Sequence, residues 1–138
     1  MDSELERLGR VVKQAQHRQF RAIETALNAI GTTLVQWDAL RAIGTQPRAS
    51  AHELALATFQ TDQAFSTLGA RLAAQDLIDR RNGAGRRIEH RLTAKGEKLL
   101  ATANIVADRV RSELYAPVPK SDRHELLRIL NNFVAADG

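Results

Sequence analysis

The chain has no cysteine, and its 138 residues include no long apolar run. The first absence excludes disulfides, thiolate metal sites and cysteine nucleophiles. The second excludes a membrane-spanning helix, which needs about 20 consecutive apolar residues. The N-terminal stretch MDSELERLGR also lacks the apolar centre of a signal peptide. We therefore expect a cytoplasmic protein that makes no contact with a membrane.

Aromatic residues are scarce as well, at 4% of the sequence, so the core has to consist mainly of Leu, Ile, Val and Ala. The length and the ordinary share of hydrophobic residues indicate a single soluble domain over residues 1–138. Sixteen of the twenty basic residues are arginine, and the formal net charge is +4. Because the guanidinium group matches phosphates and guanine edges, the arginine bias favours an anionic partner.

The sequence shows no pattern typical of catalysis. No two histidines are spaced three or four residues apart, as a metal-ligand pair on a helix would be. The Gly-containing stretch RNGAGRR lacks the strand-to-helix order of a phosphate loop, and no Ser-His-Asp set is indicated. We expect no metal site, no cofactor and no enzymatic activity.

Apolar residues spaced three or four apart predict a mainly α-helical chain. The predicted helices cover residues 3–30, 33–44, 50–58, 61–75, 94–115 and about 121–135. Thr33 with Gln36, and Ser50 with Glu53, have the spacing of capping boxes at helix starts. Gly44 is expected to end the second helix.

A basic β-hairpin is predicted between the fourth and fifth helices. The stretch DLIDRR is typical of a short strand, NGAG of a turn, and RRIEHRLT of a returning strand with alternating apolar residues. Residues 79–91 carry five basic and two acidic side chains. Over residues 33–93, the order of helix, short helix, helix and two-stranded ribbon predicts a winged helix-turn-helix.

The fourth helix is the candidate DNA-recognition helix. Its apolar residues are expected to be buried. Gln63, Ser66, Thr67 and Arg71 lie mainly on the other sides of the helix. In a helix-turn-helix the second helix enters the major groove, where Gln63 can read adenine and the hydroxyls can bond bases or phosphates. The alternative is that these polar residues are simply solvated; the basic hairpin that follows favours binding of double-stranded DNA.

The terminal segments 3–30 and 94–135 carry longer apolar stripes than a winged helix of about sixty residues could cover. We interpret them as dimerisation helices of a two-fold homodimer. Two recognition helices would then lie about 34–36 Å apart, which predicts a pseudo-palindromic operator. The alternative is that these helices fold back within one subunit.

Three stretches, in order and with matching spacing, resemble the MarR family of bacterial transcription regulators. They are LVQWDALRAI, ELALATFQTDQAFSTLGARLAAQDLIDR and RRIEHRLTAKG. The resemblance covers essentially the whole chain and implies a homodimeric winged helix that binds operator DNA, usually as a repressor. It also implies modulation by a small ligand, often an aromatic or phenolic acid. The carried-over recognition positions are Gln63, Ser66, Thr67 and Arg71.

Two positions depart from the family pattern. The wing of the family usually carries Asp-x-Arg, whereas this sequence has Ala84, Gly85 and Arg86. Arg86 and Arg87 are the wing residues that we expect at a narrow minor groove, and without the aspartate both lack a local anchor. Arg80 or Arg81 can instead pair with Asp79 or Glu89. The glycine that usually follows the recognition helix is replaced by Asp76, which tolerates a left-handed backbone.

The resemblance also implies a ligand pocket between the first, second and fifth helices, beside the dimer interface. His17 and Trp37 are the candidate ligand-binding residues there. A lone Trp on an amphipathic helix can equally be a core residue. The remaining alternative for the whole chain is a winged-helix module that binds an acidic protein and no DNA.

Overall fold

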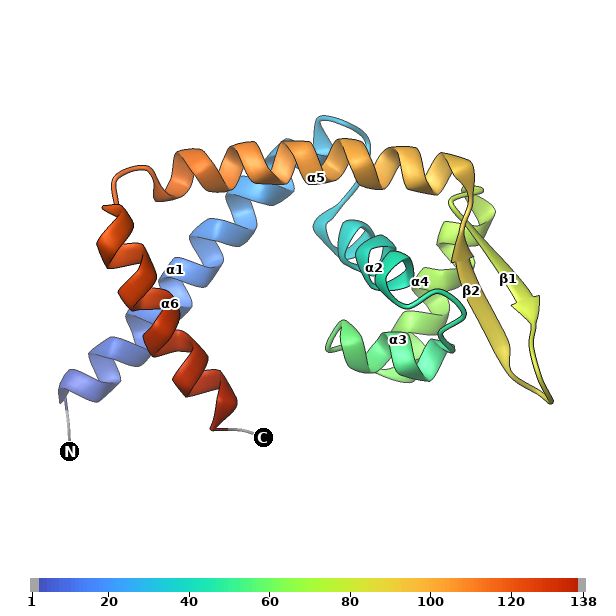
Figure 1. Ribbon diagram of the computed structural model, residues 1–138, viewed down its shortest axis with the longest axis horizontal. Helices are drawn as coiled ribbons and strands as arrows, with labels where there is room; N and C mark the ends of the chain where they lie inside the picture. Colours follow the sequence, from blue (N-terminus) through green and yellow to red (C-terminus); the bar gives the residue numbers. More distant parts are fainter. Residues whose placement is uncertain (1–2, 137–138) are drawn as a thin grey trace.

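The computed structural model describes residues 3–136 and shows a mainly α-helical chain with one small sheet (Figure 1). The elements are α1 (Ser3–Asn28), α2 (Leu34–Thr45), α3 (Ala51–Ala57), α4 (Asp62–Ala74), β1 (Ile78–Asn82), β2 (Ile88–Leu92), α5 (Ala94–Tyr115) and α6 (Lys120–Ala135). This order confirms the predicted fold class, a winged helix-turn-helix flanked by N- and C-terminal helices.

Side-chain caps define four of the helix starts. The hydroxyls of Thr33, Ser50, Thr61 and Thr93 each accept a hydrogen bond from the backbone N–H three residues later. At α3 the capping box is complete, because the Glu53 carboxylate also accepts from the backbone N–H of Ser50. Each cap satisfies a backbone donor that the first turn leaves unpaired.

The first helix closes at Gly31, a C′ glycine with φ of 87°, because the N–H groups of Gly31 and Thr32 donate to the carbonyls of Asn28 and Leu27. Two local predictions, both at α2, need correction. Gly44 does not end α2 but lies within it, where an added Cβ would come within 3.3 Å of Leu92 and Leu100 side chains. At α2 only half of the capping box forms, since the Gln36 side chain instead accepts from the Thr32 hydroxyl.

The sheet is an antiparallel hairpin in which Ile78 pairs with Leu92 and Asn82 with Ile88. The loop before α3 attaches to its second strand, because the Arg48 N–H donates to the His90 carbonyl and the His90 N–H donates to the Ala49 carbonyl. Since an isolated two-stranded ribbon is only marginally stable, this attachment holds the base of the wing to the helices.

Two clusters of buried side chains form the core. The larger joins α2, α3, α4 and the start of β1, and Phe65 of α4 is fully buried within it. The smaller lies where the C-terminal half of α1 meets α2 and α5, around Trp37. Figure 1 shows α5 running across the top of the molecule from the wing to the arm that α1 and α6 form.

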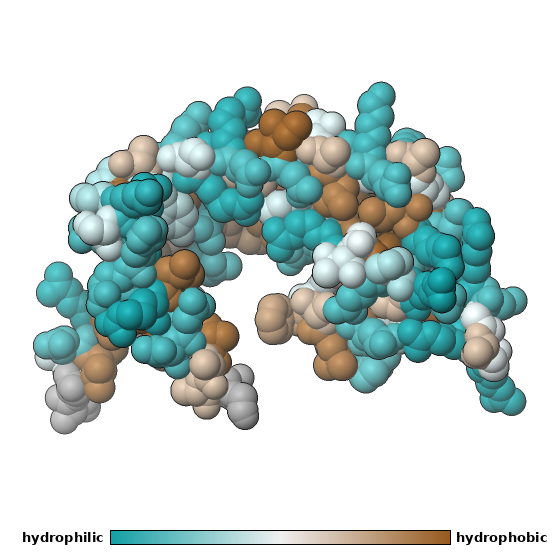
Figure 2. All heavy atoms as spheres, viewed as in Figure 1, coloured by the Kyte–Doolittle hydropathy of each residue, from teal (hydrophilic) through white to brown (hydrophobic). Residues whose placement is uncertain are grey.

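That arm is apolar and largely uncovered. No residue of α6 is buried, and α1 buries only Ile23 and Leu27, both in its C-terminal half. The exposed large hydrophobic residues on the two helices include Leu5, Leu8, Val11, Val12, Leu126, Leu127, Ile129, Leu130, Phe133 and Val134. Figure 2 shows brown side chains along both parts of the arm. None of the helices within residues 3–136 is long and apolar enough to cross a membrane.

Candidate nucleic-acid interface

Helix α4 presents the polar face that we predicted. Its apolar residues Phe65, Leu68 and Leu72 are buried against the winged-helix core. The four predicted DNA-contacting residues of this helix, Gln63, Ser66, Thr67 and Arg71, are all exposed. The burial of one side therefore leaves the other side free for a base edge or a phosphate.

The first turn of α4 is hydrogen-bonded to α3 through a His–Asp pair. His52 Nδ1 lies 2.9 Å and 3.1 Å from the two carboxylate oxygens of Asp62, and both side chains are exposed. Asp62 also lies at the positive end of the helix dipole. The pair joins the two helices of the helix-turn-helix directly at the end of α4 that begins the recognition surface.

The wing projects from the same body as α4, and its strands are strongly basic. Arg81 Nη2 lies 3.6 Å from Asp79 Oδ2. Of the pairings expected for Arg80 and Arg81, the one between Arg81 and Asp79 is therefore present. Arg86 lies in the turn, is exposed, and makes no hydrogen bond or ion pair with any of residues 3–136. Within the wing turn, residues 83–87, it is therefore the cation available to an anionic partner.

Arg87 does not lack an anchor, which corrects the expectation from the missing aspartate. Its Nη2 donates a 3.0 Å hydrogen bond to the carbonyl oxygen of Arg48 and also binds the Glu53 carboxylate on α3. The hydrogen bond from the backbone N–H of Ser50, followed by the one from Arg87, lowers the pKa of Glu53 to about 2. Sequence reasoning assigned Glu53 only to the helix cap, and no local pattern reveals its second partner, 34 positions away.

A buried histidine supports the wing from below. His90, on β2, is only 3% exposed; its Nδ1 lies 2.9 Å from the Ala49 carbonyl oxygen and its ring packs edge-on against Phe65. Burial lowers its pKa, and the nearby charge of Arg80 lowers it further. The side chain thus connects β2, the loop before α3 and the core of α4 at one point.

The structure separates the two candidate ligand-binding residues. His17 is exposed and lines a shallow hollow on α1 with basic neighbours such as Arg10 and Lys13. Trp37 is only 3% exposed and fills the predicted space between α1, α2 and α5, where its Nε1 donates a 2.9 Å hydrogen bond to Asn104. In the described chain Trp37 is therefore a core residue, in agreement with the alternative interpretation.

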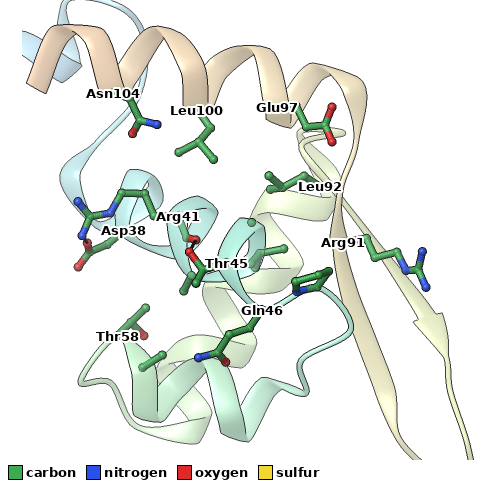
Figure 3. Close-up of a pocket in the computed structure, with 15 residues that line it drawn as sticks. Asp38, Arg41, Thr45, Gln46, Thr58, Arg91, Leu92, Glu97, Leu100 and Asn104 are labelled. Atoms are coloured by element: carbon green, nitrogen blue, oxygen red, sulfur yellow. Dashed lines mark hydrogen bonds and ion pairs between the residues drawn. The ribbon is translucent and has the colours of Figure 1, made fainter. Parts of the chain in front are cut away.

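A groove of about 900 Å³ lies between α2 and α5 and reaches β2 (Figure 3). Leu92 and Leu100 point into it, whereas Arg91 points away from it. Asn104, the partner of the buried Trp37, also lines it. Arg41 contributes a cation, which stacks 4.3 Å from the centre of the Trp37 ring. The groove thus combines an apolar wall with a mixed polar lining, in which Arg41 is paired with Asp38 at 3.2 Å.

The helix-turn-helix pair and the basic two-stranded wing define a winged helix-turn-helix protein. The model of the MarR family matches residues 30–88, the segment from the end of α1 to the start of β2. No curated protein sequence matches the chain.

Solved structures resemble almost the whole chain. A Mycobacterium tuberculosis MarR family protein in complex with salicylic acid is 26% identical, with a TM-score of 0.75 over 91% of this chain and 95% of that one. The same M. tuberculosis protein in complex with DNA is 24% identical, with a TM-score of 0.77 over 91% and 96% of the two chains. A mutant of E. coli MarR in complex with operator DNA is 18% identical, with a TM-score of 0.86 over 96% and 99%. These findings confirm the relation to the MarR family that the motifs predicted.

Proposed function

We propose that this chain is a transcription regulator that binds double-stranded DNA sequence-specifically and acts as a repressor at a pseudo-palindromic operator. The observation that carries the proposal is the exposed polar side of α4 beside a wing whose Arg86 is unpaired within residues 3–136. Such a pair of elements matches a major groove and the phosphates or minor groove next to it. The DNA complexes of the M. tuberculosis and E. coli relatives support the same assignment.

The salt dependence of duplex binding tests this proposal. A protein with about six to ten phosphate contacts loses about 10³–10⁵ in affinity between 50 and 200 mM salt. We expect this loss for the wild type, and a smaller slope for Arg86→Gln. Binding of genomic fragments to the purified protein would identify the operator and its half-site spacing. A chain that binds no duplex at low salt would instead be a protein-interaction module.

The proposed active form is a homodimer. The exposed apolar residues of α1 and α6 are too many for a surface that stays in water, and a two-fold interface would cover them. Leu130→Glu and Phe133→Glu on α6 should convert the dimer to a monomer and abolish binding to a two-site operator. Sedimentation measures the mass, and the exposed Leu56→Glu on α3 is the control. A wild-type monomer would contradict this part.

The proposed regulator responds to a small aromatic acid, as the salicylic acid complex of the M. tuberculosis relative suggests. The groove between α2 and α5 has an apolar wall for a ring, and a ligand carboxylate would compete with Asp38 for Arg41. Trp37 is the sole tryptophan and bonds to Asn104 in this groove, so its fluorescence reports occupancy. Salicylic acid should quench Trp37 fluorescence and weaken DNA binding in the wild type, but not in the Leu100→Arg variant, in which a charged side chain replaces part of the apolar wall. Unchanged fluorescence and unchanged DNA affinity would count against the effector.

A further inference from the structure

The wing and α3 meet through one ion pair, which we call the wing–α3 contact. It consists of the Arg87 guanidinium bound to the Glu53 carboxylate and to the carbonyl oxygen of Arg48. Glu53 is itself fixed by the capping box, because the backbone N–H of Ser50 donates to its Oε1 at 2.9 Å. The capping box therefore fixes the Glu53 carboxylate within α3 independently of its bond to the wing.

The wing–α3 contact lies at the turn end of the hairpin, and this position determines which part of the wing it can fix. The bonds between the loop at Ala49 and β2 at His90 hold the base of the wing. Beyond them, the turn is closed by the Gly83 N–H donating to the Arg87 carbonyl and by a longer bond from the Arg87 N–H to Ala84. Within residues 3–136, the wing–α3 contact is the link between this turn and the helices.

The residue next to the contact is the unpaired cation of the wing turn. Arg86 directly precedes Arg87, and no carboxylate within the turn orients it, because residue 84 is alanine. A turn that contains Gly83 and Gly85, the latter with φ of 66°, has little intrinsic stiffness. The direction in which Arg86 projects therefore depends on how Arg87 is held.

We propose that Glu53 and Arg87 are positioning residues for DNA binding: their ion pair fixes the wing turn against α3 and so directs Arg86 toward the duplex beside α4. The inference rests on the proposed function and adds a residue of α3 to it. Fixing the turn before binding reduces the ordering that binding requires, and this is how preorganisation raises affinity. Arg87 then acts through its neighbour rather than as a phosphate ligand of its own.

Charge alone predicts the opposite effect of a mutation. Glu53 is an acidic group beside the proposed DNA-binding surface, so Glu53→Gln makes that surface more positive and also releases Arg87. If only electrostatic attraction mattered, the variant would bind DNA more tightly. If the ion pair positions the wing, the variant binds more weakly despite its higher positive charge. The sign of the change separates the two explanations.

The experiment compares Glu53→Gln, Arg87→Gln, the double variant and Asp108→Asn in the full-length chain. Glutamine at position 53 keeps an acceptor oxygen for the Ser50 N–H, so the helix cap is preserved. Asp108→Asn is the matched control, since it breaks the Asp108–Arg111 pair on α5 with the same change of charge. Duplex affinity is measured at several salt concentrations, and amide hydrogen exchange is measured at residues 83–87 of the free protein.

We expect Glu53→Gln and Arg87→Gln each to weaken duplex binding about threefold to tenfold, the cost of ordering one or two side chains. The double variant should be no weaker than the single ones, because both remove the same interaction. Exchange at residues 83–87 should become faster in all three and stay unchanged in Asp108→Asn. Arg87→Gln should leave the salt slope nearly unchanged, whereas loss of a phosphate contact lowers it by about one.

The outcomes distinguish this proposal from the proposed function. A wild type that binds duplex, with a Glu53→Gln variant that binds equally well or more tightly, overturns the positioning role and leaves the DNA-binding proposal intact. Unchanged exchange at residues 83–87 overturns it as well, whatever the affinity. A wild type that binds no duplex overturns both proposals.

Discussion

Nδ1 of His90 on β2 lies 2.9 Å from the carbonyl oxygen of Ala49, 41 positions earlier in the chain. The same two residues are joined by a backbone hydrogen bond of 3.1 Å. The side chain and the backbone N–H of His90 therefore both bind the carbonyl oxygen of Ala49. Because the ring is buried against Phe65, this junction of wing and core is sensitive to protonation.

We predict that stability falls as the pH drops below about 6.5. Burial lowers the pKa of folded His90 from its ordinary value of 6.5, so the unfolded chain binds a proton that the folded chain does not. The loss should level off once the pH is below the folded pKa. Urea unfolding between pH 5 and 8 measures it. His90→Asn, whose amide can still donate to Ala49, should reduce the slope, and the exposed His124→Asn is the control.

Asp76→Gly should stabilise the protein. Asp76 follows α4 with φ of 61°, a left-handed conformation that costs a residue with a Cβ about 1 kcal/mol. Its carbonyl accepts a 2.7 Å hydrogen bond from the Thr93 hydroxyl, and glycine retains this backbone acceptor. We expect a gain of about 0.5–1 kcal/mol in the free energy of unfolding and a loss for Asp76→Ala. An alanine variant more stable than the glycine variant would contradict this explanation.

Gly96→Ala should destabilise the start of α5. An added Cβ would lie 2.0 Å from the carbonyl oxygen of Leu77, so the helix or the strand would have to move. We expect a loss of about 1–3 kcal/mol, the usual effect of overpacking. Gly9→Ala is the matched control within α1, where an added Cβ meets nothing within 4 Å and alanine favours the helix. Thermal unfolding of both variants should therefore show shifts of opposite sign.

Gln63→Ala should change base preference at the operator. Gln63 is exposed in the first turn of α4, where a bidentate amide contact discriminates bases by about 1–3 kcal/mol. Affinities for a set of single-base operator variants measure the change. Gln75→Ala, at the opposite end of the same helix, should leave the preference unaltered. Equal weakening on every variant would show that Gln63 contacts the backbone rather than a base.

The sequence predicted features that depend on neighbouring residues. Ser50 and Glu53 are three positions apart, and the capping box that this spacing indicates is present. Thr93 and the apolar period after it predicted α5 with its observed bounds of 94–115. In both cases the interacting groups lie within one helical turn, so short sequence patterns contain the necessary information.

The features that the sequence did not predict depend on distant partners. Local reasoning explained Glu53 completely by its cap and left Arg87 without an anchor, although the two bind each other across 34 positions. Alternation placed His90 on one face of its strand, but the Ala49 carbonyl that receives it comes from another loop. Gly44 lies inside α2 rather than at its end, and the side chains that require a glycine there, Leu92 and Leu100, are about fifty residues further along.

Helix α5 connects the wing to the distant arm as one uninterrupted rod. Its N-cap, Thr93, is bonded to the chain before β1, and the hydroxyl of its last residue, Tyr115, donates a 2.6 Å hydrogen bond to Gln19 of α1. Twenty-two residues make a helix about 33 Å long, so a tilt of about 5° at one end moves the other by about 3 Å. In the proposed homodimer, the angle at which the far end of α5 is held would therefore set the distance between the two wings.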